Sequence, residues 1–191
     1  MNNECRPLNQ EETAILSTLK GERLNQIDAC IVARDDTAWG NVRLHLDGAD
    51  IDICIQLGEA VVDEAGESDE FGFLSVKKTS RATLEVAEAS PETTVIQIND
   101  AIKDMTVVNE RINIYSHDML VSTIETTQAI ILQLNDSTIA LDRECWFSDT
   151  LTLKQTEPRQ ADLYDDSLNW ANNPEEEPDC RYDVSYTYID L

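Results

Sequence analysis

The sequence predicts an α+β fold that is mostly β: an antiparallel sheet, sandwich or open barrel of short strands, with an N-terminal helix packed on it. Apolar and polar residues alternate over most of the chain, short polar turns separate the alternating runs, and a helical pattern occurs near the N-terminus. Short strands at close and regular spacing are typical of antiparallel sheets.

The helix is expected over residues 8–23. Asn9 suits its start, Glu11 and Glu12 suit the positive end of the helix dipole, and Gly21 suits its stop. One short apolar face would pack on the sheet, formed by Ala14, Ile15, Leu16 and Leu19.

Residues 42–57 have the pattern of a β-hairpin. An alternating run that begins at Val42 is followed by the turn Asp47-Gly48 and then by a second alternating run. Burial on one face of these strands predicts a core row of Ile51, Ile53, Ile55 and Leu57, joined by Ile130, Leu132 and Leu134.

The same alternation continues to the end of the chain. Strands of four to seven residues are expected at 71–76, 82–87, 94–100, 111–116, 119–125, 129–134, 137–142 and 151–155, and a last one carries Tyr182, Tyr186 and Tyr188. Segments 41–55 and 129–145 both read as strand, acidic turn, strand and cysteine. This likeness leaves open either a duplication or two unrelated hairpins.

A chain of 191 residues can bury a core without disulfides. We expect a mostly-β globular domain over 1–156, with an acidic loop and C-terminal strand over 157–191 packed on the same domain. No apolar run approaches the roughly 20 residues of a membrane helix, the N-terminus lacks a signal-peptide pattern, and the five cysteines show no CxxC spacing. We therefore expect a cytoplasmic protein with free thiols and no membrane contact, in an oligomeric state that the sequence leaves open.

The formal net charge is −24, and it is unevenly distributed. Segment 59–70 has six acids and no base, and segment 157–191 has a net charge of −8. These 47 residues therefore hold −14, against −10 on the other 144. Local blocks of like charge are typical of solvated loops, tails or interaction surfaces. A salt-adapted host would spread acid more evenly, although the low lysine count, five, keeps that alternative open.

The residue patterns predict no catalytic site. Ser116, His117 and Asp118 include the residue types of a hydrolase triad, but neighbours on an extended chain point to opposite faces, so a turn is expected there. His45 and Cys54 share the polar face of the hairpin without an orienting group in view. We therefore expect no enzyme activity.

Cofactor, metal and nucleic-acid sites are not expected either. The aspartates of "DGADID" lack the glycine and glutamate positions of a calcium loop, and the chain has no glycine-rich phosphate loop. With two histidines far apart, a zinc site is not expected. Direct nucleic-acid binding needs clustered lysine and arginine side chains. The only closely spaced basic residues in the sequence are Lys77, Lys78 and Arg81.

The charge favours a protein-binding role with a basic partner, because net charge far from zero steers association with oppositely charged proteins. We expect an acidic inhibitor, foremost an immunity protein that neutralises a cationic toxin such as a nuclease. One alternative is a phage-encoded nucleic-acid mimic that inhibits a defence complex, which should carry a long ladder of carboxylates at alternate strand positions that this sequence lacks. A second alternative is a structural or assembly protein without catalysis.

The predicted binding surface combines the two acidic segments with an aromatic anchor, because tryptophan and tyrosine are frequent at binding hot spots. Pro174 and Pro178 bracket the second acidic loop and would stiffen it. The rival explanation is a merely solvated linker before the last strand. The candidate residues are Glu59, Asp63, Glu64, Glu67, Asp69, Glu70, Asp165, Asp166, Trp170, Glu175, Glu176, Glu177 and Asp179.

Overall fold

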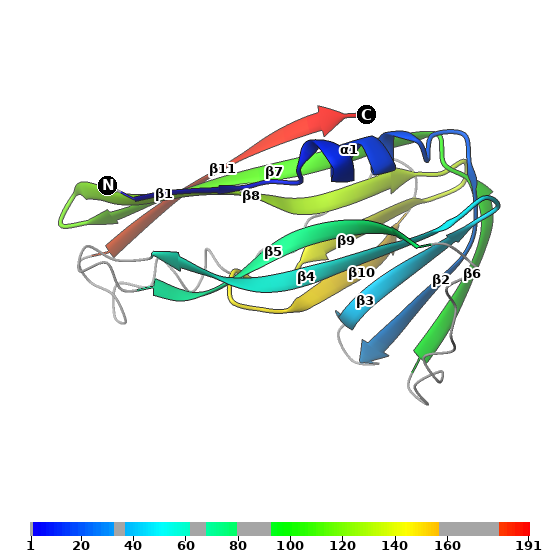
Figure 1. The fold of residues 1–191 in the computed structure, drawn as a ribbon, viewed down its shortest axis with the longest axis horizontal. Helices are drawn as coiled ribbons and strands as arrows, with labels where there is room; N and C mark the ends of the chain where they lie inside the picture. The colour runs from blue at the N-terminus through cyan, green and yellow to red at the C-terminus, as the bar shows by residue number, and fades with distance from the viewer. Residues whose placement is uncertain (1, 33–36, 62–67, 80–92, 157–179) are drawn as a thin grey trace.

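The structure, a computed structural model, describes residues 2–32, 37–61, 68–79, 93–156 and 180–191. Within these ranges the chain forms eleven strands and one short helix (Figure 1). The expected mostly-β fold with an N-terminal helix is therefore confirmed. No helix in the described ranges is long and apolar enough to cross a membrane.

The elements follow one another along the chain with short connections where these are described. They are β1 (Asn2–Arg6), α1 (Gln10–Ser17), β2 (Arg23–Val32), β3 (Thr37–Leu46), β4 (Asp50–Val61), β5 (Ser68–Thr79), β6 (Thr93–Ala101), β7 (Asp104–Ser116), β8 (Met119–Gln133), β9 (Thr138–Arg143), β10 (Thr150–Thr156) and β11 (Cys180–Asp190).

Hydrogen bonds join the strands in the order β11-β7-β8-β9-β10-β3-β2-β6, with β4 paired to β3, β5 paired to β4, and β1 paired to β8. The β1–β8 pair is parallel and the others are antiparallel. Figure 1 shows two layers: β1, β7, β8 and β11 lie in one, β2 to β5 lie in the other, and β9 and β10 connect them. The C-terminal strand β11 pairs with β7 along its whole length.

Between the layers lies a main hydrophobic cluster with side chains from α1 and from most of the strands. A second cluster, which we call the hairpin-end cluster, lies beneath the far end of the β4–β5 hairpin. It consists of Ala60, Phe71, Phe73, Ile112, Ile114, Ile124 and Trp146, with Tyr182 and Val184 of β11 packed against it.

The helix is shorter than the expected 8–23. Asn9 caps it: its side chain accepts hydrogen bonds from the backbone of Glu11 and Glu12, and the Glu12 side chain accepts one in return from the Asn9 backbone. The helix ends at Ser17. Gly21 follows with φ of +86° and donates its N–H to the Ile102 carbonyl at 2.8 Å, which ties the turn to the connection between β6 and β7. Glycine suits that conformation without strain.

Segments 119–125 and 129–134, expected as two strands, are one strand, β8, and this expectation was wrong. The polar residues between them stay extended because their side chains have buried partners. Thr127 donates to the Asn109 side chain and accepts from the Leu8 N–H, and Gln128 donates to the Arg143 carbonyl. β1 and β2 were not predicted, and the expected strand at 82–87 lies outside the described residues.

The predicted core row is confirmed except at its last residue. Ile51, Ile53 and Ile55 are at most 8% exposed, whereas Leu57 is 44% exposed. Beyond Ile55 the hairpin buries its opposite face, with Ala60 and Phe71 in the hairpin-end cluster. Leu57 is thereby left at a surface hollow of about 280 Å³. The second predicted row, Ile130, Leu132 and Leu134, is buried.

Candidate protein-binding surface

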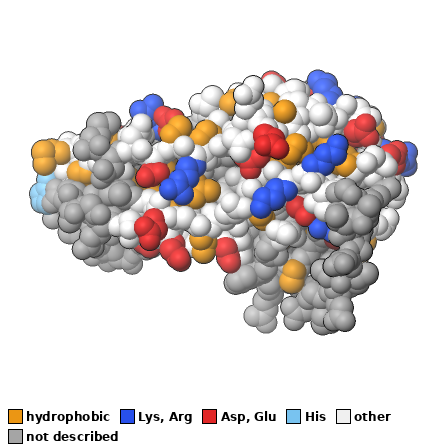
Figure 2. Space-filling view, in the orientation of Figure 1, with side chains coloured by type: hydrophobic (Ala, Val, Ile, Leu, Met, Phe, Trp, Pro, Cys, Tyr) orange, Lys and Arg blue, Asp and Glu red, His pale blue; other side chains and the backbone are white. Residues whose placement is uncertain are grey.

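Three predicted site residues lie at the far end of the β4–β5 hairpin. Glu59 on β4 is directly opposite Glu70 on β5, and Asp69 is opposite the neighbouring Ala60. All three side chains are exposed, and the Asp69 carboxylate accepts the Glu70 N–H at 2.8 Å. Figure 2 shows acidic side chains gathered over this part of the hairpin. We call Glu59, Asp69 and Glu70 the acidic end.

The acidic end is not neutralised by basic side chains of the described ranges. No Lys or Arg of these ranges forms an ion pair with its three carboxylates. Arg6 donates to the backbone carbonyl of Glu59 at 3.3 Å, but its ion pair is with Glu4 at 3.4 Å. Like charges directly opposite each other on a sheet are destabilising. The Glu59–Glu70 pair therefore lowers the stability of the hairpin.

An exposed aromatic side chain lies at the edge of β5, close in the strand to the acidic end. Phe147, in the connection between β9 and β10, is 37% exposed. Its ring lies edge-on to the rings of Phe71 and Trp146, with centroids 6.2 and 6.4 Å away. Phe71 directly follows Glu70 on β5, so Phe147 packs one residue along the strand from the acidic end, while the side chains of Phe71 and Glu70 point to opposite faces of the strand.

The β9–β10 connection is fastened to the edge of β5 at Gly72. The Gly72 N–H donates to the Trp146 carbonyl at 2.8 Å. A Cβ at position 72 would lie 2.5 Å from the Ser148 carbonyl oxygen, so only glycine allows this close approach. The exposed Asp149 follows in the same connection. The backbone hydrogen bond between Gly72 and Trp146 thus fixes the neighbouring Phe147 at the edge of the hairpin.

Beneath this surface lies a buried ionic network. Arg143 and Glu110 are fully buried and paired with each other. Arg143 also donates to the Gly72 carbonyl at 2.9 Å and to the Gln128 side chain at 2.8 Å, and Trp146 donates to Glu110 at 3.2 Å. Each charge has a counter-charge and further hydrogen bonds, the condition under which buried ions are tolerated. The network holds the β9–β10 connection against β5 and β7.

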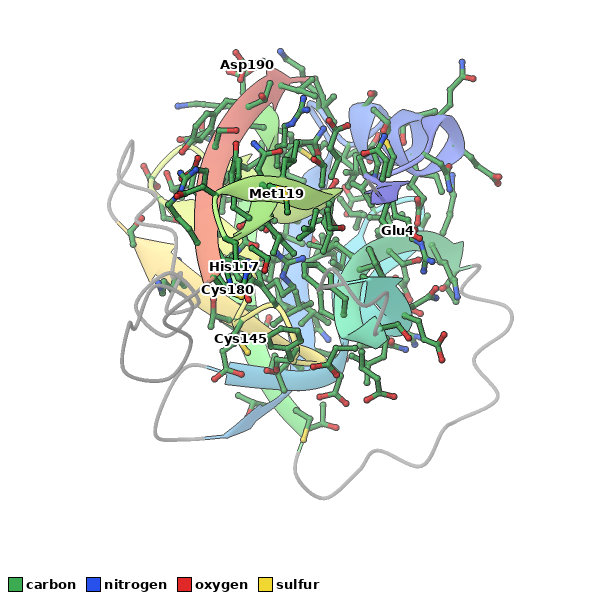
Figure 3. The ribbon with its side chains drawn as sticks, turned by 90° about the vertical axis from the view of Figure 1, so that its left-hand side faces the viewer. Glu4, His117, Met119, Cys145, Cys180 and Asp190 are labelled. Atoms are coloured by element: carbon green, nitrogen blue, oxygen red, sulfur yellow. The ribbon has the colours of Figure 1, made fainter. Side chains whose placement is uncertain are left out.

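Tyr182, near the start of β11, reaches the same end of the molecule. Its ring centroid lies 5.4 Å from that of Trp146. Figure 3 views this end directly, with Cys180 at the start of β11 and Cys145 in the β9–β10 connection both labelled. The β4–β5 hairpin, the β9–β10 connection and the start of β11, which are far apart in sequence, therefore meet at this end.

The remaining predicted site residues lie outside the described residues, so their relation to the acidic end stays a prediction. They are Asp63, Glu64, Glu67, Asp165, Asp166, Trp170, Glu175, Glu176, Glu177 and Asp179.

His45 is held between two carboxylates, and Cys54 is partly buried. The two ring nitrogens of His45 lie 2.8 Å from an Asp28 oxygen and 3.1 Å from an Asp50 oxygen. Both nitrogens are thus engaged by carboxylates, and burial raises the pKa of the Cys54 thiol, which disfavours a thiolate.

The turn predicted at Ser116-His117-Asp118 is confirmed. His117 and Asp118 both have positive φ, 48° and 61°, in the tight connection between β7 and β8. Within the described ranges no group of three or more His, Cys, Asp or Glu side chains could hold a metal ion.

Comparisons with protein-family models, with curated proteins and with solved structures found no match to this chain.

The sequence-based prediction missed Phe147. The sequence feature that could have identified Phe147 is the stretch "CWFSD", residues 145–149, in which two aromatic residues stand in a polar connection between two predicted strands. Apolar side chains in such a connection are either buried beneath it or exposed for binding, and here Trp146 is buried and Phe147 exposed.

Proposed function

We propose that this protein binds and inhibits a basic protein through the acidic end and Phe147, and that toxin neutralisation, as by an immunity protein, is the setting that suits it best. One observation carries the proposal: Glu59 and Glu70 face each other, exposed and without an ion-pair partner among the described residues, and an exposed aromatic ring packs on Phe71, the next residue of β5. An arrangement that lowers stability is typical of a functional surface.

The physical basis of such binding is long-range attraction followed by local burial. An uncompensated acidic surface on a chain of net charge −24 raises the encounter rate with a basic protein by about 10 to 10³-fold at low salt. Phe147 then supplies apolar area, since aromatic anchors with a charged rim are a common plan of protein interfaces.

Nucleic-acid mimicry fits the described surface less well. A mimic needs carboxylates that repeat like phosphates along a strand, at alternate residues. On the described part of the hairpin, Glu59 and Glu70 sit across from each other, and the alternate positions Leu57 and Gly72 carry no charge. The acids thus form a compact group instead of a row.

The test uses three forms of the protein as baits for lysate of the source cells. The site variant carries Glu59→Gln, Asp69→Asn and Glu70→Gln. The control variant carries the same number of neutralised acids, Glu22→Gln, Asp47→Asn and Asp136→Asn, in turns at the opposite end of the molecule (Figure 1).

We expect a basic protein to be retained by the wild type and by the control variant and lost from the site variant, in low salt. The activity of the captured basic protein should fall when the wild type is added, and nuclease activity is the first to be assayed. Equal retention of the same basic proteins by all three baits would contradict the role of the acidic end. Retention without any loss of the captured protein's activity would contradict inhibition.

A further inference from the structure

We infer that the turn between β7 and β8 is a second part of the binding surface, with Met119 as an apolar anchor that enters a hollow of the basic partner. The inference rests on the proposed function. Two observations carry it: Met119 is 61% exposed, and the turn keeps two side chains at backbone positions that favour glycine. Figure 3 looks directly at this end of the molecule, with His117 and Met119 labelled.

The turn has two residues. Ser116 and Met119 are the last pair of the β7–β8 ladder, and His117 and Asp118 lie between them with φ of 48° and 61°. Positive φ at both central residues is the type I′ pattern, in which Asn-Gly is the preferred pair. Histidine and aspartate tolerate this region better than most residues, but glycine occupies it without steric strain. The turn therefore keeps side chains that lower its stability.

Strained backbone of this kind is typical of functional positions. Nδ1 of His117 lies 3.1 Å from the Ser116 hydroxyl, so the histidine helps to hold the turn. Asp118 is exposed and forms no ion pair with a lysine or arginine of the described ranges. Its negative charge therefore stands at the tip of the turn, next to Met119.

Met119 is the most exposed of the large apolar side chains in the described ranges. A methionine adapts to an irregular hollow because its side chain is unbranched and flexible. It projects from a fixed base, since Val121, two residues further on, packs against the hairpin-end cluster. A single exposed apolar side chain needs no explanation by itself. The position of Met119 relative to the acidic end gives it one.

The turn and the acidic end share the hairpin-end cluster as their base. This cluster contains Ala60 and Phe71 of the β4–β5 hairpin, each next in sequence to a residue of the acidic end, and also Ile124 of β8. Met119 precedes Ile124 by five residues of strand, about 17 Å. Figure 1 shows the β7–β8 turn and the end of the β4–β5 hairpin at the same end of the molecule. A standard interface of about 800 Å² per partner is roughly 30 Å across, so one partner can cover both.

This arrangement defines the chemistry of the partner. Its basic surface would face the acidic end and Asp118, and an apolar hollow beside that surface would take Met119, in the common plan of apolar anchors with a charged rim. Charge alone attracts many basic proteins, whereas a hollow at the right distance is found on few. The acidic end thus steers association, and the turn selects among basic proteins.

The strain of the turn is tested without any partner, by thermal melts of two double variants. His117→Asn with Asp118→Gly supplies the preferred type I′ pair and should raise the melting temperature by about 2 °C or more. His117→Ala with Asp118→Ala removes the same side chains without relieving the backbone and should lower it. A melting temperature that is not raised by the first variant would contradict the strain on which the inference rests.

The contact is tested by photo-crosslinking in the source cells. The photoreactive residue benzoylphenylalanine is placed at position 119, at position 147 or at position 95, where Val95 is 51% exposed on β6. We expect positions 119 and 147 to give an adduct of the same mass and position 95 to give none of that mass. With the photoreactive residue at 147, Met119→Gln should lower the yield of this adduct at least about threefold, because it removes the apolar anchor, and Val95→Thr should leave it unchanged.

The outcomes separate the inference from the proposed function. An adduct from position 147 but none from position 119, or an adduct at 147 whose yield Met119→Gln does not lower, would overturn the inference and leave the proposed function standing. An adduct from position 119 alone would support the turn and contradict the role of Phe147. No adduct from either position would overturn both.

Discussion

Glu110, in the core beneath the β4–β5 hairpin, and Glu70, on the exposed end of that hairpin, are both carboxylates in contrasting surroundings. Glu110 is fully buried, paired with Arg143 and hydrogen-bonded by Trp146. Glu70 is exposed and directly opposite another carboxylate, Glu59. The chain compensates the charge that it buries and leaves uncompensated the charge that it exposes here.

This difference separates two uses of acidic residues. In the core, pairing is needed because an unpartnered buried charge costs several kcal/mol. At the exposed end repulsion costs little, about 0.2 to 1 kcal/mol, so it can be maintained for binding. Removing charge should therefore destabilise the first region and slightly stabilise the second.

The largest effect is expected in the buried network. Arg143→Met should lower the free energy of unfolding by about 3–5 kcal/mol, because it leaves Glu110 buried without its counter-charge. The double variant Arg143→Met with Glu110→Gln should be more stable than Arg143→Met alone. Urea unfolding of the wild type, both single variants and the double variant measures this. A double variant less stable than Arg143→Met would show that the charge of Glu110 is not what destabilises the single variant.

A smaller loss is expected at Glu12. One oxygen of its carboxylate accepts from Ser75 and Val76 on β5, both at 3.0 Å, and the other caps α1 through the Asn9 N–H. Glu12→Ala should cost about 1–3 kcal/mol, through the lost charged hydrogen bonds and cap. Glu12→Gln, which keeps an acceptor oxygen, should cost less, and Glu11→Ala serves as the control in the same helical turn. Equal melting temperatures for Glu12→Ala and Glu11→Ala would contradict this account.

A still smaller and pH-dependent effect is expected at Asp52. Burial acts to raise the pKa of this carboxyl, but hydrogen bonds from Arg43 and Thr79 and the charge of Arg43 outweigh it, so the pKa lies below its ordinary value. A depressed carboxyl pKa contributes stability above the unfolded pKa, about 3.9, and loses it as pH falls through the folded pKa.

Asp52→Asn should therefore cost about 1 kcal/mol or less near neutral pH, and the difference from the wild type should shrink as pH falls below about 4 and disappear only below the folded pKa. Denaturant unfolding at a series of pH values measures it. Asp104→Asn is the control, because its exposed pair with Lys20 should contribute little at any pH. A difference that grows on acidification would contradict the assignment.

The smallest effect is a gain. Glu59→Gln with Glu70→Gln should raise the free energy of unfolding by about 0.2–1 kcal/mol, by relieving the cross-strand repulsion. Thermal melts at low and high salt measure it, and the gain should shrink as salt screens the pair. A loss of stability would mean that the two carboxylates make favourable contacts in the native state.

The sequence predicted the parts of the fold that rest on local patterns. The hairpin row from Ile51 to Ile55 and the Asn9 cap follow from side-chain alternation and capping chemistry, and both are present. What it did not predict depends on partners far along the chain. The polar centre of β8 stays extended because Leu8, Asn109 and Arg143 satisfy it, and Leu57 is exposed because the hairpin changes its buried face.

The candidate site divides in the same way. Glu59, Asp69 and Glu70 were predicted from the local density of charge, and the structure places them together at one end. Phe147 reaches them only through the contact of the β9–β10 connection with Gly72, a pairing separated by more than seventy residues that no local pattern encodes.

The most direct test of the central claim is the association rate with the captured basic protein, measured by stopped flow against ionic strength. The wild type and the control variant, Glu22→Gln with Asp47→Asn and Asp136→Asn, should associate fast at low salt and slow steeply as salt rises. The site variant, Glu59→Gln with Asp69→Asn and Glu70→Gln, should associate more slowly, with a flatter salt dependence and undiminished thermal stability. A site variant whose rate and salt slope match those of the control variant would contradict the claim that the acidic end is the recognition surface.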